Sequence, residues 1–309
     1  MNHSDFQISH FIIVGFPAPE DMPSRIILFT FFLLIYVLTL LENSILLLII
    51  RQDAHLHSPM YLFICNLAVL DMCLPSVTVP QVMHQILRND KFIDFLSCII
   101  QMGSFICFNV IEGLLLGVMA YDRYQAICKP LHYPLVMNNM QAVRLAAFCW
   151  VPGIITGFGH LWAVLTLPFC GPNKIFNYYC EHMEIIKLSC TDVSAYSIIT
   201  VAAVVIVMFV SICLILLSYI KILIAAIKVT SSEGLQKAFS TCASHLIVIS
   251  LFLVIQGGLL VSKQMKDTSI NVSVLAGFIP NIIPPLMNPI IYCLKTSGIR
   301  TGLIKLLKQ

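Results

Sequence analysis

Two adjacent charged residues lie near the end of a long apolar segment. Asp122 and Arg123 follow a run that begins near Cys98 and is mostly hydrophobic, and a tyrosine flanks the pair on each side. An arginine is costly inside hydrocarbon but is tolerated where a membrane helix reaches the water boundary. Opposite charges placed side by side there can neutralise each other until a partner competes for the arginine. The pair is therefore either a polar anchor at the lipid interface or part of a switch.

A second group of polar residues is predicted at the middle of the bilayer. Asp71 lies about 18 Å along a helix from Pro59, at 1.5 Å of rise per residue. By the same rise, Glu112 lies about 16 Å back from Arg123. Polar side chains at one level on several helices should converge inside a bundle, because facing lipid is costly. They either join the helices by hydrogen bonds or form a cation or proton site between the two acids. At this level also lie Glu42 and Asn43 in the first apolar segment and Asn288 in the last.

Membrane helices are the elements that must position these residues. The chain has 309 residues, of which 59% are hydrophobic and only 11% are charged. A soluble protein of this length would need more charges to cover its surface. A helical span requires about 20 apolar residues, and the apolar runs are too long for barrel strands. Seven spans are predicted, at residues 25–50, 59–86, 98–122, 142–166, 195–227, 238–262 and 270–293.

The distribution of basic residues orients these spans. Seven spans place the two termini on opposite sides, and eleven of the 18 Lys and Arg residues fall on the side of Arg123 and the carboxyl terminus. That side is expected in the cytoplasm, with the amino terminus outside. No signal peptide is recognisable, so the first span should act as an uncleaved anchor. Asn2 begins a glycosylation acceptor sequence on the outer side, and Asn271 begins another that would serve only if it clears the membrane. The net charge of +3 gives no indication of nucleic-acid binding.

The segment 167–194 is long for a connection inside a compact bundle, and it lies on the outer side. It contains Cys170, Cys180 and Cys190, and Cys98 lies at the outer end of the third span. Disulfides persist in that environment, and four cysteines allow three pairings. A bond from the third span to this loop would fold the loop over the mouth of the bundle as a lid. The sequence Cys-Glu-His at 180–182 is also compatible with a fragment of a metal site, a weaker alternative.

The last two spans and the tail have further polar features. At the start of the sixth span, hydroxyl residues and His245 share helix faces, so this histidine is either a satisfied interior residue or part of a switch or docking surface. The seventh span contains four prolines between residues 280 and 289, which predicts a kinked and partly hydrated helix near Asn288. The tail alternates apolar and basic residues, as in a short amphipathic helix on the inner leaflet.

The chain contains the motifs LHSPMY at 56–61, MAYDRYQAIC at 119–128, SY at 218–219, KAFSTCASH at 237–245 and NPIIY at 288–292. With these motifs it resembles vertebrate odorant receptors within the rhodopsin-like G-protein-coupled receptors, over essentially its whole length. The expected fold class is an all-α membrane protein, a seven-transmembrane helix bundle with its N-terminus outside and a short amphipathic eighth helix. One receptor domain would span 1–309, with an extracellular N-terminus at 1–24, the second extracellular loop at 167–194 and a cytoplasmic tail at 294–309.

The resemblance also implies roles for individual residues. Arg123 would be the switch arginine, held inactive by Asp122 and released to engage a G protein. The resemblance further implies bonds between Cys98 and Cys180 and between Cys170 and Cys190. The other implied switch residues are Tyr124, Tyr219 and Tyr292, and the implied buried ion or water site consists of Asn43, Asp71, Glu112 and Asn288. No cofactor is expected apart from a sodium ion near Asp71 and Glu112.

A family-type ligand pocket can be placed on the sequence in the same way. The implied ligand is a small, neutral, volatile odorant, and the implied partners are a stimulatory heterotrimeric G protein, which raises cyclic AMP, and membrane lipids. The expected location is the plasma membrane, in sensory cilia if the receptor is olfactory. The implied pocket residues are Met102, Phe105, Ile106 and Asn109 of the third span, Ala203 and Val207 of the fifth, Leu253 and Gln256 of the sixth, and Phe278 and Asn281 of the seventh.

Three positions depart from the family pattern. Glu42 replaces the usual glycine, which adds an acid near mid-bilayer. Gln125 replaces the usual valine after the charge pair, on the G-protein side. Residues 252–254 are Phe-Leu-Val in place of Phe-Tyr-Gly, which removes a tyrosine hydroxyl from the pocket floor.

Other functions fit the same residues less well. A transporter would explain Asp71 and Glu112, but the sequence has no internal repeat. A retinal receptor needs a lysine within a span, and the sixth and seventh spans have none. No nucleophile and base pair indicates an enzyme. A non-olfactory receptor for another ligand, such as a peptide or an amine, stays open, although the outer half of the third span has no acid between Asp94 and Glu112.

Overall fold

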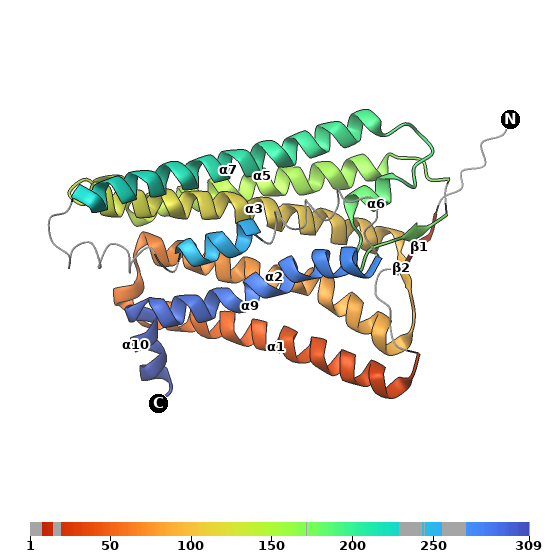
Figure 1. Cartoon of the computed structure of the whole chain (residues 1–309), viewed down its shortest axis with the longest axis horizontal. Helices are drawn as coiled ribbons and strands as arrows, with labels where there is room; N and C mark the ends of the chain where they lie inside the picture. Colours follow the sequence, from red (N-terminus) through yellow and green to blue (C-terminus); the bar gives the residue numbers. More distant parts are fainter. Residues whose placement is uncertain are drawn as a thin grey trace.

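The computed structural model describes residues 8–14, 20–170, 172–228, 243, 245–254 and 270–308. Long helices run side by side and a small sheet lies at one end of them (Figure 1). The long helices are α1 (Met22–Gln52), α2 (Pro59–Arg88), α3 (Phe95–Cys128), α5 (Asn139–Leu165), α7 (Ser194–Lys228) and α9 (Ile270–Lys295). The short ones are η1 (Ala54–Leu56), α4 (Tyr133–Val136), α6 (His182–Ile186) and α10 (Ser297–Leu306), and a further helical segment covers His245–Val254.

The predicted spans correspond to these helices. Five of them, α1, α2, α3, α5 and α7, are long and apolar enough to cross a membrane. The predicted seventh span is α9. Of the predicted sixth span, 238–262, the helical segment His245–Val254 lies within the described residues together with residue 243. The fold is a seven-transmembrane helix bundle.

Residues at the helix ends explain where several spans begin and stop. Asp21 caps α1 by accepting a hydrogen bond from the Ser24 amide at 2.8 Å. Pro59 occupies the first turn of α2, where a missing N–H costs nothing, and α2 ends at Asn89 in the left-handed conformation, with φ of 54°. The third span is longer than predicted, because α3 continues to Cys128. Asp122 and Arg123 therefore lie inside the helix and not at its end.

Helix α3 is the centre of the bundle. It packs against α2, α5 and α7, and Figure 1 shows it between α2 and the α5–α7 pair. Glycines let α3 and α5 approach closely, as is common between membrane helices. A Cβ added at Gly157 would lie 2.6 Å from the Gly103 carbonyl oxygen and 2.7 Å from the Cβ of Cys107. The side chains of α3 are consequently held in a fixed position relative to α5.

A three-stranded sheet, which was not predicted, covers the outer end of the bundle. Its order is β2 (Phe92–Asp94), β1 (His10–Ile13), β3 (Lys174–Ile175), with β1 antiparallel to β2 and parallel to β3. Phe11 of β1 is fully buried and lies 5.5 Å from the Phe95 ring and 6.0 Å from the Phe169 ring. The amino-terminal segment is thereby joined to the loop 167–194.

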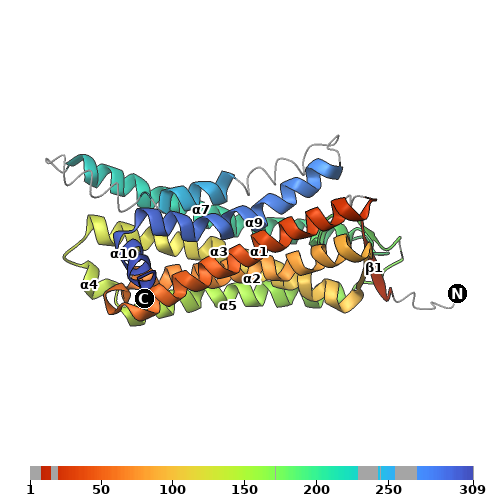
Figure 2. The same cartoon turned by 90° about the horizontal axis from the view of Figure 1, so that it is seen from below.

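Disulfides and the final helix complete the two ends of the bundle. Bonds join Cys98 to Cys180 and Cys170 to Cys190, which is the pairing implied by the family resemblance, and the first ties the loop to α3. At the opposite end α10 packs on α1: a Cβ at Gly302 would lie 2.5 Å from Ile49. Strand β1 and helix α10 lie at opposite ends of the molecule (Figure 2).

Candidate functional site

The charge pair on α3 forms a buried, hydrogen-bonded cluster. The Arg123 Nε and Nη2 atoms donate to Asp122 Oδ2 at 3.0 and 2.5 Å. Tyr133 of α4 donates its hydroxyl to the other carboxylate oxygen at 2.9 Å. Asp122 is fully buried and Arg123 is 9% exposed. Burial and the negative charge of Asp122 raise the pKa of Tyr133 above its usual value, so the phenol stays a neutral donor. An anchor at the lipid interface would be exposed, whereas this pair is buried and its two charges are paired with each other. We call Asp122, Arg123 and Tyr133 the lock.

The neighbours of the lock come from the cytoplasmic ends of α3 and α7. The Tyr124 ring lies 5.7 Å from the Lys129 ammonium and 5.3 Å from that of Lys221. Gln125, the departure from the family pattern, is buried and donates to the Tyr121 hydroxyl at 2.6 Å. The amide nitrogen of this glutamine is thus paired on its own helix, one turn from Tyr121, while its Oε1 atom has no hydrogen-bond partner among the described residues.

Two buried polar rings lie together where the sixth and seventh spans meet. The rings of His245 and Tyr292 are 5.8 Å apart, and both residues are almost completely buried. Among the described residues, neither ring nitrogen of His245 has a hydrogen-bond partner, and the Tyr292 hydroxyl has none either. Buried polar atoms of this kind usually bind ordered water. Tyr219 of α7 packs against the hydrophobic core cluster that includes Tyr292.

The mid-bundle polar residues join α1, α2 and α9. Asn288 donates to both carboxylate oxygens of Asp71, at 3.1 and 3.0 Å. Asn43 donates to the Pro285 carbonyl at 3.0 Å. Pro289 has no N–H to donate to that carbonyl four residues earlier, so Asn43 supplies the missing hydrogen bond. Glu112 of α3 is also buried. The mid-bundle polar residues thus form hydrogen bonds between helices.

The residues of the implied ligand pocket have different surroundings. Met102 and Asn281 are buried, Phe105, Ile106, Asn109, Val207, Leu253 and Phe278 are half-buried, and Ala203 is exposed on α7. Gln256 lies outside the described residues, as does the glycosylation candidate Asn2. Asn109 donates to the Phe105 carbonyl of its own helix at 2.9 Å. Three of these residues, Phe105, Phe278 and Asn281, are brought together by the loop above them.

Tyr178 and Tyr179, which the sequence analysis missed, make that connection. The Tyr179 ring lies 4.6 Å from the Phe105 ring, and the Tyr178 ring lies 5.5 Å from that of Phe278. Asn281 donates its side-chain amide to the Tyr178 hydroxyl. Burial raises the pKa of both phenols above the usual value, so they act as neutral groups. Their only sequence signal was adjacency to Cys180, which the disulfide holds against α3.

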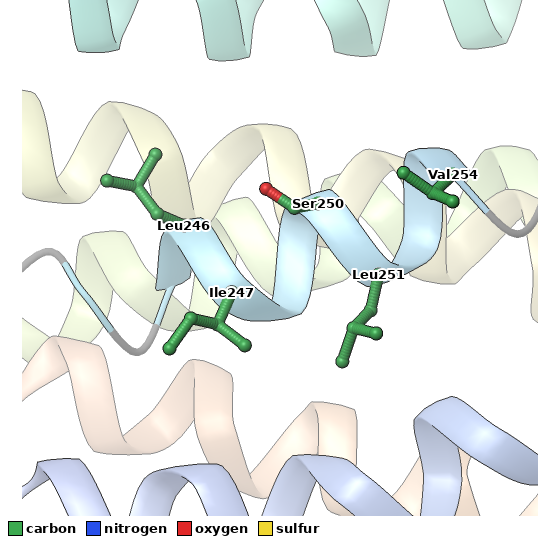
Figure 3. A pocket seen from close by; sticks show the side chains of 5 residues that line it. All are labelled: Leu246, Ile247, Ser250, Leu251 and Val254. Atoms are coloured by element: carbon green, nitrogen blue, oxygen red, sulfur yellow. The ribbon is translucent and has the colours of Figure 1, made fainter.

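Two apolar hollows occur away from these residues. The first, of about 350 Å³, runs along the helical segment His245–Val254 and is lined by Leu246, Ile247, Ser250, Leu251 and Val254 (Figure 3). The second, of about 380 Å³, follows α7 and is lined by Ser197, Ile198, Ala202 and Val205. Val254 and Val205 are exposed, as expected for side chains that face lipid. None of the implied pocket residues lines either hollow, so we assign both to the outer surface of the bundle.

The weaker metal alternative in the loop finds no support in the part of the chain that the structure describes. There, no group of three or more His, Cys, Asp or Glu residues is arranged to hold a metal ion. Cys180 is bonded to Cys98 and offers no thiolate. The Glu181 carboxylate accepts the Glu184 amide at 3.0 Å, and the His182 Nε2 atom lies 3.2 Å from the Tyr196 hydroxyl. These residues cap α6 and join the loop to α7.

The chain is similar to known proteins over nearly its whole length. The family model described as olfactory receptor matches residues 32–309. The chain is 37% identical to human olfactory receptor 2A12, over 99% of its own length and 98% of that protein, and 39% identical to human olfactory receptor 10A5, over 96% and 93%. The fold is similar to that in the crystal structure of squid rhodopsin, with a TM-score of 0.74, 15% identity and coverage of 96% of this chain and 90% of that one.

Proposed function

The chain belongs to the olfactory receptor family, and we propose that it binds a small, neutral, volatile molecule within its helix bundle and raises cyclic AMP through a stimulatory, olfactory-type G protein. Proteins of this family are multi-pass membrane receptors with small-molecule ligands and G-protein partners, and they are not enzymes. What is proposed beyond that membership is the class of ligand, the class of G protein, and the site of action in the plasma membrane of sensory cilia.

The observation that carries the signalling proposal is the buried pair of Asp122 and Arg123. The arginine is neutralised by a carboxylate that also accepts a hydrogen bond from Tyr133. Removing one partner from a buried ion pair is strongly unfavourable, so Arg123 stays bound to Asp122, in the closed form, until another acceptor replaces that carboxylate. A G protein that supplies such acceptors would stabilise the open form, and a ligand that favours the open form would promote coupling.

The proposal of a neutral ligand rests on the residues below the loop. Phe105, Phe278 and Asn281 provide two aromatic rings and one amide, and none of the described pocket residues is charged. Apolar walls with a few amide groups suit a small uncharged molecule. An ammonium or carboxylate ligand would lose its hydration there without gaining an opposite charge.

We also propose a sodium ion beside Asp71 and Glu112, as the family resemblance implies. Both acids are buried, and the side-chain oxygens of Asn43 and Asn288 have no hydrogen-bond donor among the described residues. Carboxylate and amide oxygens are the ligands that hard cations prefer. A sodium ion here would offset one carboxylate charge and stabilise the inactive bundle.

The proposal can be tested in cells that express the full-length chain with a cyclic AMP reporter. A panel of volatile alcohols, ketones, esters and aromatics, with matched amines and carboxylic acids, should contain neutral agonists that raise cyclic AMP in a dose-dependent way. Cells without the receptor should not respond, and surface display should be measured in parallel. Best activation by an amine or an acid would overturn the ligand class, and a response through another second messenger would overturn the G-protein class.

A further inference from the structure

Two tyrosines of the outer loop complete a continuous row of aromatic rings between helices. Tyr178 and Tyr179 are 4.8 Å apart, measured between ring centroids. On one side Tyr179 contacts Phe105 of α3 at 4.6 Å, and on the other Tyr178 contacts Phe278 of α9 at 5.5 Å in an edge-to-face arrangement. Phe278 in turn lies 5.0 Å from Phe32 of α1. The row closes the outer end of the residues implied in ligand binding.

The two tyrosines differ in how they are held. Tyr179 precedes Cys180, which is bonded to Cys98 and whose amide donates to Gln101 Oε1 at 2.9 Å. Gln101 donates in turn to the Val77 carbonyl at 2.8 Å. This end of the segment is therefore fixed to α3 and α2. Tyr178 lies one residue further from the fixed point, and its hydroxyl accepts the side-chain amide of Asn281 on α9. Tyr178 thus joins the loop to a different helix through a non-covalent contact.

We propose that Tyr178 occupies the place of the agonist's oxygen atom, so that an agonist must displace its hydroxyl from Asn281 to bind. The inference rests on the proposed ligand site and narrows its chemistry. The favoured agonists carry one oxygen that accepts a hydrogen bond, as ketones, esters and ethers do, next to an apolar body that packs on the aromatic row. In the unliganded receptor the same hydrogen bond holds the loop closed on α9.

Two substitutions break the contact between Tyr178 and Asn281, and they should affect agonists differently. Tyr178→Phe keeps the ring but removes the hydroxyl, so every agonist is spared the loss of the closed contact. Potency should then rise about fivefold for oxygen-bearing and hydrocarbon agonists alike, the change that one hydrogen bond of ordinary strength produces. Asn281→Leu also opens the contact but removes the donor that the agonist would use. Hydrocarbon agonists should gain about fivefold while oxygen-bearing agonists stay nearly unchanged.

Dose–response curves for cyclic AMP, corrected for surface display, provide the first test. The matched control is Tyr196→Phe, which removes another phenol hydroxyl between the loop and a helix, where His182 Nε2 lies 3.2 Å away. It should shift neither class of agonist. A decrease or no change in potency in a well-displayed Tyr178→Phe receptor would overturn the proposal. So would an Asn281→Leu receptor in which oxygen-bearing agonists weaken and hydrocarbon agonists do not improve.

A measurement without ligand separates this inference from the proposed function. Hydrogen–deuterium exchange of residues 175–181 in the purified full-length chain should be about fivefold faster in Tyr178→Phe and in Asn281→Leu than in the unsubstituted protein, and unchanged in Tyr196→Phe. If no volatile raises cyclic AMP but exchange accelerates as expected, the closed contact stands and the ligand class fails. If Tyr178→Phe is not displayed, Asn281→Leu alone decides, and unaltered exchange in it would overturn the closed contact.

Discussion

The Asp122 carboxylate accepts hydrogen bonds from Arg123 beside it and from Tyr133 of α4. Arg123 and Tyr133 donate three hydrogen bonds to its two oxygens. Hydrogen bonds to charged groups stabilise by about 1.5–3 kcal/mol each, more than neutral ones. Losing a single donor should therefore shift the balance between closed and open arginine without unfolding the receptor.

The residue that tests this balance is Tyr133. Tyr133→Phe removes one hydrogen bond from Asp122 and leaves the ion pair and the ring in place. We expect agonist-independent cyclic AMP to rise about threefold to tenfold, because the closed form loses more than the open form, while agonist responses persist. Tyr36→Phe is a suitable comparison, because it removes a phenol hydroxyl that contacts Ser76 at 3.0 Å, away from the lock. An unchanged basal level at equal surface display would show that Tyr133 does not contribute to the lock.

Asn109 provides a second prediction at this scale. It lies one helical turn below Phe105, whose carbonyl accepts its amide at 2.9 Å. If its side chain also contacts the ligand, Asn109→Leu should reduce the potency of polar agonists several-fold, as the loss of one hydrogen bond would, and affect hydrocarbon-like agonists less. Dose–response curves for matched pairs of agonists would measure the difference. An equal loss for every agonist would place Asn109 outside the ligand site.

Individual contacts of this kind were the least predictable from sequence. The cost of charge in hydrocarbon singled out Asp122 and Arg123 but left the pair as either an interface anchor or a switch, and the helical rise placed Asp71 and Glu112 at one depth. Tyr133 and Tyr178 were missed because both lie in connections between the predicted spans, where no hydrophobic periodicity applies. Their roles depend on short connections folding back onto distant helices, and no spacing in the chain reports such contacts.

Among the helices, the closest approach is between α3 and α5. Gly157→Ala would place a methyl group 2.6 Å from the Gly103 carbonyl oxygen. Overpacking of this kind costs about 1–3 kcal/mol, so thermal unfolding of the purified protein should occur several degrees lower. Gly159→Ala is the matched control, because a Cβ there meets no atom within 4 Å. Equal stability of the two variants would show that the approach is looser than in the structure.

The outer loop is the element whose position depends on covalent bonds. Cys98→Ser or Cys180→Ser should prevent surface display, because the lid loses its attachment to α3 and leaves a free lumenal thiol. Closing a loop of this length stabilises by about 3–5 kcal/mol in the chain-entropy model. Flow cytometry of an amino-terminal tag would measure display. Normal display and normal agonist response in both variants would contradict a structural role for the bond.

Helices were predicted far better than the sheet. Span positions follow from apolar length, which the bilayer thickness fixes. The ends of the first, second, fourth, fifth and seventh spans agree to within three residues, whereas both ends of the sixth lie outside the described residues. The end of α3 was placed too early because the charge pair was taken as the water boundary; the charges neutralise each other, so the helix continues. Strands β1, β2 and β3 have two to four residues each, too short for an alternating pattern, and they pair across segments far apart in the chain.

In the molecule as a whole, the proposed ligand site beneath Tyr178 and the lock at Arg123 are connected through α3. The two lie at opposite ends of α3, which packs against α2, α5 and α7. A ligand can shift the lock only by binding the open form more tightly than the closed one. The aromatic row joins α3, the loop and α9, so displacing Tyr178 changes how these elements contact one another.

The most direct test is the cyclic AMP response of Arg123→Ala to a volatile agonist, compared with the unsubstituted receptor at equal surface display. Arg51→Ala is the matched control, because that arginine is exposed in the last turn of α1. We expect that Arg123→Ala is displayed but gives no agonist-driven cyclic AMP, whereas Arg51→Ala responds normally. A full response by well-displayed Arg123→Ala would contradict the assignment of Arg123 as the switch.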